Sequence, residues 1–223
     1  MCGRYVLYGP DSRLIDAFGV RVMPPFVPRD NVAPQTDVLV IRERRDRVRV
    51  GEIVRWGLIP AWAGDPSIGA SLINARVESV ATKPAFRSAF LGARCIVPAN
   101  GFYDWRTVPG AARKQPWYVH PTQQPFFGFA GLIERWQGPD GVVRSCSILT
   151  CEANETLAPL HERMPCILAP QDYGRWLDPA QHDREALQAL LRPADPALVA
   201  IHPVGPAVGN TRNESPDLIL PAS

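Results

Sequence analysis

The sequence of 223 residues lacks the features that mark several familiar protein classes. No apolar run approaches the roughly 18 residues that a membrane span requires, and the N-terminus has no apolar stretch like that of a signal peptide. These absences predict a cytoplasmic protein without a membrane partner. A glycine-rich phosphate loop, an HExxH zinc pair and a GxSxG elbow are also absent, so we expect neither cofactor nor metal.

Cysteine and lysine are both scarce. The five cysteines have no paired short spacings, which excludes a disulfide framework and a zinc knuckle. Four of them are predicted to be small buried hydrophobes, namely Cys95, Cys146, Cys151 and Cys166. Only Lys83 and Lys114 are lysines among 24 basic residues, a bias that is most simply one of genome composition. With a net charge of +2, any contact with DNA must come from a local patch.

The residues that are present predict an α+β fold in a single domain. A hydrophobic content of 46% is enough for a core, and 24 prolines favour short strands joined by rigid turns. We expect a mixed or antiparallel, barrel-like sheet with short flanking helices, and a monomer. The domain is expected to span residues 1–210, followed by a tail at 211–223 that has little to pack against.

Several elements can be placed along the chain. A helix is predicted from Asp11 or Ser12 to Phe18, and alternating apolar residues from Asp37 and from Arg47 predict a hairpin. The stretch on both sides of Pro84 is helix-like. Later segments rich in aromatic and β-branched residues predict further strands, namely RCIVPA, GFYDWR, QPWYVH, FFGFAGLIERW and RSCSILTC. Two more helices are expected near the end, in QDYGRW and DREALQALL.

Cys2 is chemically distinct from the other cysteines because it follows the initiator methionine. The small Gly3 after it suits methionine removal, which would leave a free 1,2-aminothiol at Cys2. Unperturbed, the amine titrates near 7.7–8.0 and the thiol near 8.5, so both nucleophiles are expected to be partly available at neutral pH. An aldehyde is the natural electrophile: the amine forms an imine, and the thiol then closes a thiazolidine ring.

A series of motifs recurs in one order over residues 1 to about 170, namely MCGRY, NVAP, WGLIPAWA, INARVESV, RCIVPANGFYDW and LHERMP. Together they resemble the SRAP family, whose name means SOS response-associated peptidase. The resemblance implies a protein of the DNA damage response that binds single-stranded DNA at abasic sites. It also implies that the protein forms a thiazolidine with the ring-opened deoxyribose.

The resemblance assigns roles residue by residue. Cys2 is the nucleophile, Asn74 would hydrogen-bond the aminothiol or the sugar, and His161 would assist ring opening and proton transfer. Contacts with DNA are expected from arginines that suit phosphate oxygens and from a tryptophan that could stack on a base, namely Arg4, Arg76, Arg163 and Trp62.

One position departs from the family pattern. Asp104 stands before Trp105 where the family has glutamate, so the carboxylate is one methylene, about 1.5 Å, shorter. Its role in moving protons to and from the amine is the feature that this departure puts in question.

Two other classes of function fit parts of the sequence. A start of Met-Cys-Gly also occurs in N-terminal-nucleophile glutamine amidotransferases, whose downstream synthetase-type domain is missing here. A reversible reader of single-stranded or modified DNA would use the arginines and the tryptophan, and Cys2 would be incidental. The word peptidase in the family name points to cleavage at the protein's own N-terminus, since no separate protease triad is recognisable.

Overall fold

The computed structural model describes residues 2–9 and 11–222, and one of its two sheets closes on itself. Around this ring each strand pairs with the next, and the last returns to the first, in the order β10 (Gly141–Glu152), β4 (Arg49–Trp56), β3 (Asp37–Glu43), β6 (Arg94–Ala99) and β9 (Phe127–Gly138). Three short strands extend the ring: β5 (Asn74–Arg76) and β11 (Arg163–Pro165) pair with β10, and β12 (Ile167–Leu168) pairs with β9. The prediction of a mixed, barrel-like sheet is confirmed.

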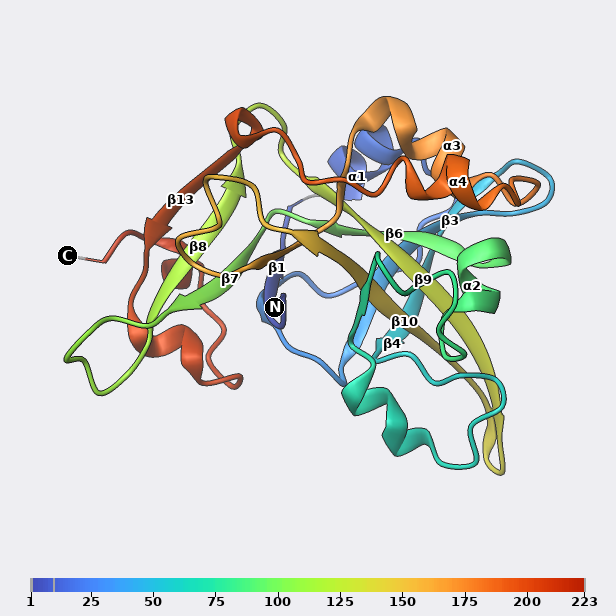
Figure 1. Cartoon of the computed structure of the whole chain (residues 1–223), viewed down its shortest axis with the longest axis horizontal. Coiled ribbons are helices and arrows are strands. Elements are labelled where there is room, and N and C mark those ends of the chain that lie inside the picture. The colour runs from blue at the N-terminus through green and yellow to red at the C-terminus, as the bar shows by residue number, and fades with distance from the viewer. Residues whose placement is uncertain (1, 10, 223) are drawn as a thin grey trace.

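The second sheet is antiparallel and has five strands. Its order is β13 (Val199–Pro203), β8 (Gln115–Pro121), β7 (Gly101–Arg106), β1 (Tyr5–Leu7) and β2 (Arg29–Val32). In Figure 1 most of this sheet lies on the left of the molecule and the ring on the right. The N-terminal strand β1 therefore lies where the two sheets approach each other.

The helices are short and lie outside the sheets. The α-helices are α1 (Asp11–Phe18), α2 (Arg87–Gly92), α3 (Tyr173–Leu177) and α4 (Arg184–Gln188). A proline, which lacks the N–H that a first turn leaves unpaired, opens each of the 3-10 helices η1 (Pro66–Ser71), η2 (Pro170–Asp172), η3 (Pro196–Leu198), η4 (Pro206–Gly209) and η5 (Pro216–Ile219). No helix among the described residues has the length and apolarity needed to cross a membrane.

The local predictions hold with two exceptions. The first helix and the hairpin of β3 and β4 lie where the sequence pattern placed them. A helix forms only after Pro84, as α2, whereas residues 77–86 form turns. The prediction of helix before Pro84 was wrong because proline pushes the preceding residue away from helical backbone angles.

The second exception is the C-terminal segment, which packs firmly. The buried side chain of Asn31 donates through Nδ2 to the carbonyls of Asn210 and Asn213, at 3.0 Å each. Leu218 is buried, and its neighbours in a second small core include Val6 and Tyr103. The expectation of a tail with little to pack against was wrong, because one buried amide satisfies several carbonyls of the segment.

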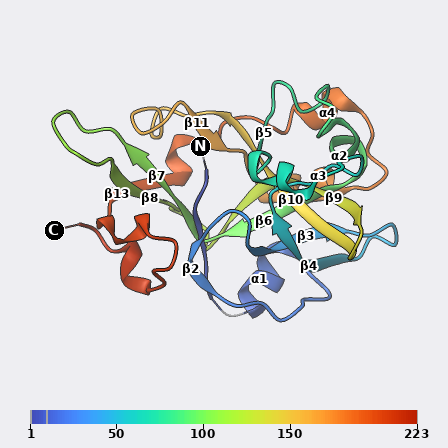
Figure 2. The ribbon, with the colours of Figure 1, turned by 90° about the horizontal axis from the view of Figure 1, so that it is seen from below.

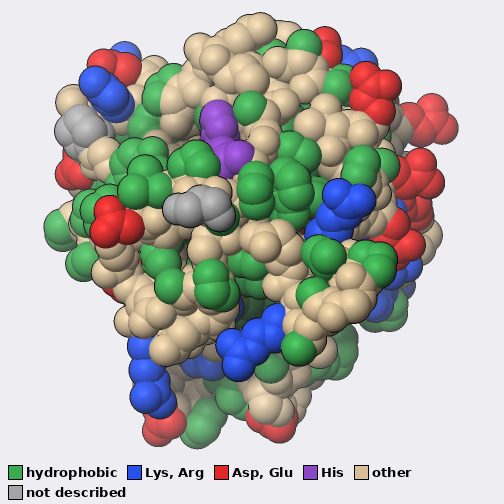
Figure 3. Space-filling view, turned by 90° about the vertical axis from the view of Figure 1, so that its left-hand side faces the viewer, with side chains coloured by type: hydrophobic (Ala, Val, Ile, Leu, Met, Phe, Trp, Pro, Cys, Tyr) green, Lys and Arg blue, Asp and Glu red, His purple; other side chains and the backbone are tan. Residues whose placement is uncertain are grey.

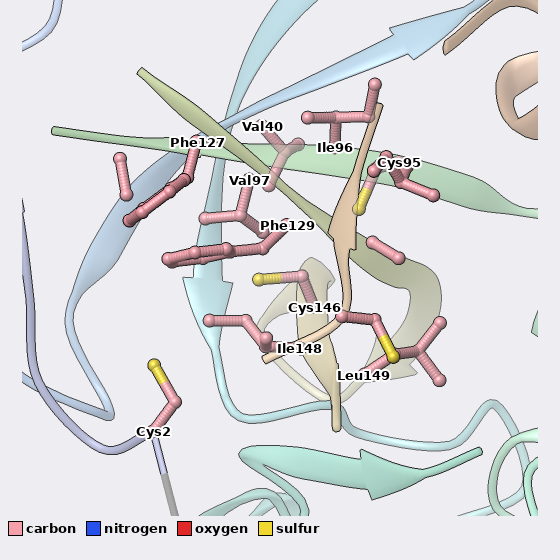
Figure 4. Packing of buried hydrophobic residues seen from close by; sticks show 14 of the residues in the cluster. Cys2, Val40, Cys95, Ile96, Val97, Phe127, Phe129, Cys146, Ile148 and Leu149 are labelled. Carbon is pink, nitrogen blue, oxygen red and sulfur yellow. The ribbon is translucent and has the colours of Figure 1, made fainter. Parts of the chain in front are cut away.

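The main core fills the interior of the ring. Figure 4 shows Val40, Phe129 and Ile148 packed together from different strands of the ring, with Cys95 and Cys146 among them. All four cysteines outside the N-terminus are buried, as predicted, and each is a free thiol. Their pattern of burial is that of small hydrophobic side chains.

Candidate active site

Cys2 is buried between the two sheets, with 1% of its surface exposed. Figure 2 shows the N-terminal strand running between the β7–β8 side of the molecule and the side that carries β5 and β10, and Figure 4 shows the sulfur of Cys2 turned toward the core. Burial raises the pKa of the Cys2 thiol to about 12, and the nearby carboxylate of Asp104 acts in the same direction. This pKa applies to the chain with Met1 in place, so the partly ionised thiol expected after removal of Met1 stays a prediction. Met1 lies outside the described residues.

Asn74 holds the backbone of Cys2. It is the first residue of β5, which pairs in parallel with β10 so that Asn74 lies opposite Ile148. Its Nδ2 donates to the carbonyl of Cys2 at 2.9 Å, whereas its Oδ1 is buried and accepts no hydrogen bond within the described part of the chain. The amide thus fixes Cys2 with one end and offers an acceptor with the other.

Asp104 is a buried carboxyl group on β7, with 6% of its surface exposed. Its Oδ1 accepts from the backbone N–H of Trp105 at 2.8 Å. Burial raises the pKa of Asp104, while His161 and Lys114 act against that rise. A carboxyl group in such surroundings can exchange a proton nearer to neutral pH than an exposed aspartate can.

His161 precedes β11 and lies close enough to Asp104 to influence its pKa. Its backbone N–H donates to the carbonyl of Leu157 at 3.1 Å. Its Nδ1 accepts from the backbone N–H of Arg163 at 2.9 Å, so the neutral ring carries its proton on Nε2. The imidazole can therefore donate a proton only from the Nε2 side.

The four residues predicted to do chemistry come from four separate segments of the chain. Cys2 precedes β1, Asn74 begins β5, Asp104 lies on β7 and His161 precedes β11. A hydrogen bond joins Asn74 to Cys2, and electrostatic coupling links Asp104 to both Cys2 and His161. A buried thiol, a polar amide and two groups able to exchange protons thus share one site.

The residues predicted to contact DNA fall into two groups. Arg76 is exposed, and Trp62 exposes 62% of its surface while its Nε1 donates to the carbonyl of Pro84 at 3.4 Å. Arg4 is half-buried, and its Nη1 donates to Asn31 Oδ1 at 2.8 Å. Trp62 and Arg76 are therefore placed to meet a ligand from solvent, whereas Arg4 is engaged inside the protein.

Arg163 is buried, and both of its terminal nitrogens already have partners within the protein. Its Nη1 and Nη2 donate to the two carboxylate oxygens of Glu78 at 2.6 and 3.0 Å, and Nη2 also donates to the carbonyl of Thr150 at 2.6 Å. A phosphate could take the place of Glu78 only by breaking this pair. The contact of Arg163 with DNA stays a prediction, and the structure shows a different set of partners for it.

Sequence reasoning missed a hollow beside Asp104. It has a volume of about 460 Å³ and lies between the β7–β8 connection and η4, where its lining includes Trp105, Arg113 and Lys114. Figure 3 looks at this side of the molecule and shows Lys and Arg side chains in the lower part of the face. Trp105 was visible in the GFYDW motif, but nothing in the sequence placed the two basic residues next to it.

Two further observations bound the chemistry. Within residues 2–9 and 11–222 there is no group of three His, Cys, Asp or Glu side chains that could hold a metal ion. A separate cavity of about 500 Å³, lined partly by Phe126, Leu168 and Tyr173, includes none of the four residues around Cys2. The site around Cys2 is thus distinct from this cavity.

Comparison with known proteins identifies the family. A family model described as SOS response associated peptidase (SRAP) matches residues 1–211. The chain belongs to the SRAP family. Its relatives include the abasic site processing protein YoqW of Bacillus subtilis, 38% identical over 98% of this chain and 99% of the relative. They also include YedK of Escherichia coli, of the same description and 32% identical over 89% of this chain and 86% of the relative.

The likeness extends to an animal protein and to a solved structure. The abasic site processing protein HMCES of Rattus norvegicus is 28% identical over 100% of this chain and 76% of its own length. A crystal structure of a protein from Bacteroides thetaiotaomicron superposes with a TM-score of 0.88 over 100% of both chains, at 23% identity. This last similarity shows that the fold is shared.

Proposed function

We propose that this SRAP protein captures abasic sites in single-stranded DNA as a covalent adduct of Cys2, after Met1 has been removed. The observation that carries the proposal is that Asn74 and Asp104 both lie near Cys2, and that His161 lies near Asp104. The relatives named as abasic site processing proteins support it. The peptidase activity of the family name is, in this proposal, limited to processing of the N-terminus.

The reaction balances with the loss of one water. The ring-opened sugar of an abasic site offers an aldehyde, and the α-amine of Cys2 adds to it to give a carbinolamine. Loss of water from the carbinolamine leaves an imine. The thiol of Cys2 then adds across the C=N bond, sulfur to carbon and proton to nitrogen, and closes the five-membered thiazolidine.

The buried thiol favours an order in which the amine reacts first. In this proposal the thiol of Cys2 stays buried once Met1 is removed, so its pKa stays raised and it does not compete for the aldehyde as a thiolate. Nucleophilic attack by a thiolate on an amide, as an amidotransferase would require, is disfavoured for the same reason. Ring closure then needs a group that takes the thiol proton, and Asp104 lies near the thiol.

The proton transfers are divided between Asp104 and His161. Carbinolamine dehydration needs an acid, and a carboxyl group with a raised pKa can supply a proton at moderately acid to neutral pH. His161 presents Nε2–H as a second donor, since its Nδ1 is occupied by Arg163. The open Oδ1 of Asn74 can accept from the carbinolamine hydroxyl or the amine.

The exposed residues supply the contact with DNA. Trp62 presents a ring on which an unpaired base can stack, and Arg76 adjoins the site because β5 carries both Asn74 and Arg76. Single strands suit this arrangement because their bases are free to stack and their backbone bends into the site. Trp105, Arg113 and Lys114 extend the surface on the other side of Asp104.

Intact-mass analysis tests the proposal. The protein is mixed with a single-stranded oligonucleotide that carries one abasic site, and the expected product has the mass of protein without Met1 plus oligonucleotide minus one water. Cys2→Ala should give no stable adduct, whereas Cys95→Ala removes a buried thiol elsewhere and should react normally. A stable adduct with Cys2→Ala contradicts the thiazolidine, and binding without any adduct in the parent protein would leave a reversible DNA reader.

A further inference from the structure

Glu78 binds Arg163 from an exposed position. It lies two residues after β5, in the turns at 77–86, and half of its side chain is exposed, compared with 9% for Arg163. Both of its oxygens accept from the guanidinium, one from each terminal nitrogen. Such bidentate pairs are stronger and more directional than single charged hydrogen bonds.

Arg163 ties three segments of the chain together through this pair. Its side chain reaches Glu78 after β5 and the carbonyl of Thr150 on β10, while its backbone forms the start of β11. The Nε of Arg163 is buried and has no hydrogen-bond partner among the described residues. Without Glu78, the buried guanidinium would keep a neutral carbonyl as its partner but no carboxylate, and the arrangement would lose its main anchor.

The same residue orients the imidazole of His161. The backbone N–H of Arg163 donates to His161 Nδ1 at 2.9 Å, and Arg163 pairs with Glu152 at the start of the β10–β11 ladder. The β10–β11 pairing holds the backbone of Arg163, and the side-chain pair with Glu78 holds the same residue from the other side. Glu78 is therefore linked through Arg163 to His161 Nδ1, the ring nitrogen whose hydrogen bond decides which nitrogen of His161 carries the proton.

We propose that Glu78 is a positioning residue for the reaction at Cys2: through Arg163 it holds His161 in the tautomer that presents Nε2–H. Glu78 touches neither Cys2 nor, in this proposal, the DNA. The inference rests on the proposed function for its consequence in catalysis. Its structural part concerns the DNA-free protein and can be tested separately.

The experiment compares Glu78→Gln with Glu155→Gln, which makes the same change at an exposed glutamate in the segment before His161. Nitrogen-15 NMR of the imidazoles, assigned with His161→Asn, reports which nitrogen of His161 is protonated. We expect a single tautomer in the parent and in Glu155→Gln, and a mixture in Glu78→Gln. With saturating abasic oligonucleotide, Glu78→Gln should crosslink about tenfold more slowly, a small part of what general acid–base catalysis contributes.

Glu78→Asp is the control that separates loss of the carboxylate from a general loss of structure. It keeps the charge, and because the site is half exposed, we expect it to restore the tautomer and most of the crosslinking rate of the parent. The proposal is overturned if Glu78→Gln keeps the parent tautomer and rate, or if Glu155→Gln falls equally. It is also overturned if the variant loses only affinity for DNA and reacts normally at saturation. If the parent forms no adduct, the proposed function fails, while the tautomer still decides the role of Glu78.

Discussion

Arg76 and Arg163 lie on the two short strands that flank β10, one at the end of β5 and the other at the start of β11. Both were predicted to hold phosphates, yet their surroundings differ. Arg76 is exposed, whereas Arg163 is buried against the carboxylate of Glu78 and the carbonyl of Thr150. Two arginines with the same predicted role thus have different surroundings: Arg76 faces the solvent, and Arg163 is held by partners inside the protein.

The same division separates the whole site into a buried and an exposed part. Cys2 and Asp104 are almost completely buried, and burial raises the pKa of both. Trp62 and Arg76 remain in water. Burial shifts the pKa values of groups that can react, whereas exposed side chains keep their hydration until a charged ligand binds.

The largest expected difference between the two arginines is in stability. Arg163→Ala should lower the free energy of unfolding by roughly 2 kcal/mol, because it removes the bidentate pair with Glu78 and a buried hydrogen bond to the Thr150 carbonyl. The loss is limited because that carbonyl keeps the backbone N–H of Val77 and the half-exposed Glu78 can regain water. Arg76→Ala should change it by less than about 0.5 kcal/mol. Urea unfolding measures both free energies. Equal losses of stability in the two variants would contradict a structural role that belongs to Arg163 and not to Arg76.

The next largest effect is expected for the rate of reaction in the buried part. Asp104→Asn removes the proton-exchanging group but keeps the shape, so crosslinking should slow about tenfold or more, with little loss of DNA binding. Asp104→Glu restores the length that the family has and should react at least as fast as the parent. Time courses at several pH values decide the matter, and a normal rate for Asp104→Asn would leave His161 as the only proton-transfer group.

A smaller effect is expected for DNA binding by the exposed part. Arg76→Ala should weaken binding to a single strand and make the salt dependence shallower, since each lost phosphate contact releases about 0.7 fewer counterions. Under conditions where it stays folded, Arg163→Ala should keep the parent slope. Salt titrations by fluorescence anisotropy measure both. A lower slope for Arg163→Ala alone would reverse the roles given to the two residues.

Local pattern was enough to predict much of the fold. The first helix begins at Asp11, one of the two residues predicted to start it, and the hairpin of β3 and β4 follows from two largely apolar segments separated by a polar turn. The membership of Cys2, Asn74, Asp104 and His161 in one site followed from their motifs. Each of these inferences needs only neighbours in sequence, or residues whose joint pattern marks a family.

Apart from the helix wrongly predicted before Pro84, the features that sequence reasoning missed depend on contacts between distant segments. The thiol pKa of Cys2 is set by burial between two sheets, which no property of the first residues reveals. The pairing of Arg163 with Glu78 joins positions 85 residues apart. The C-terminal segment, likewise, is held by the amide of Asn31 rather than by any pattern of its own. Burial and partner choice are tertiary properties.

The smallest predicted effect concerns the stability that the buried carboxyl group costs. Burial raises the pKa of Asp104 above its value in the unfolded chain, so the folded protein binds this proton more tightly. The stabilisation is therefore fully present below the unfolded pKa of about 3.9 and is lost as the pH rises through the folded pKa. Asparagine stays neutral throughout this range.

We therefore expect Asp104→Asn to melt about 2 °C above the parent at pH 7 and level with it near pH 4. Asp140→Asn, at an exposed position before β10, is the matched control and should show no difference that changes with pH. Differential scanning calorimetry across this range measures the effect. A parent protein that is more stable than Asp104→Asn at pH 7 would mean that the partners of the carboxylate outweigh the cost of its burial. The buried part of the site would then not cost the protein stability, as this comparison with the exposed part assumes.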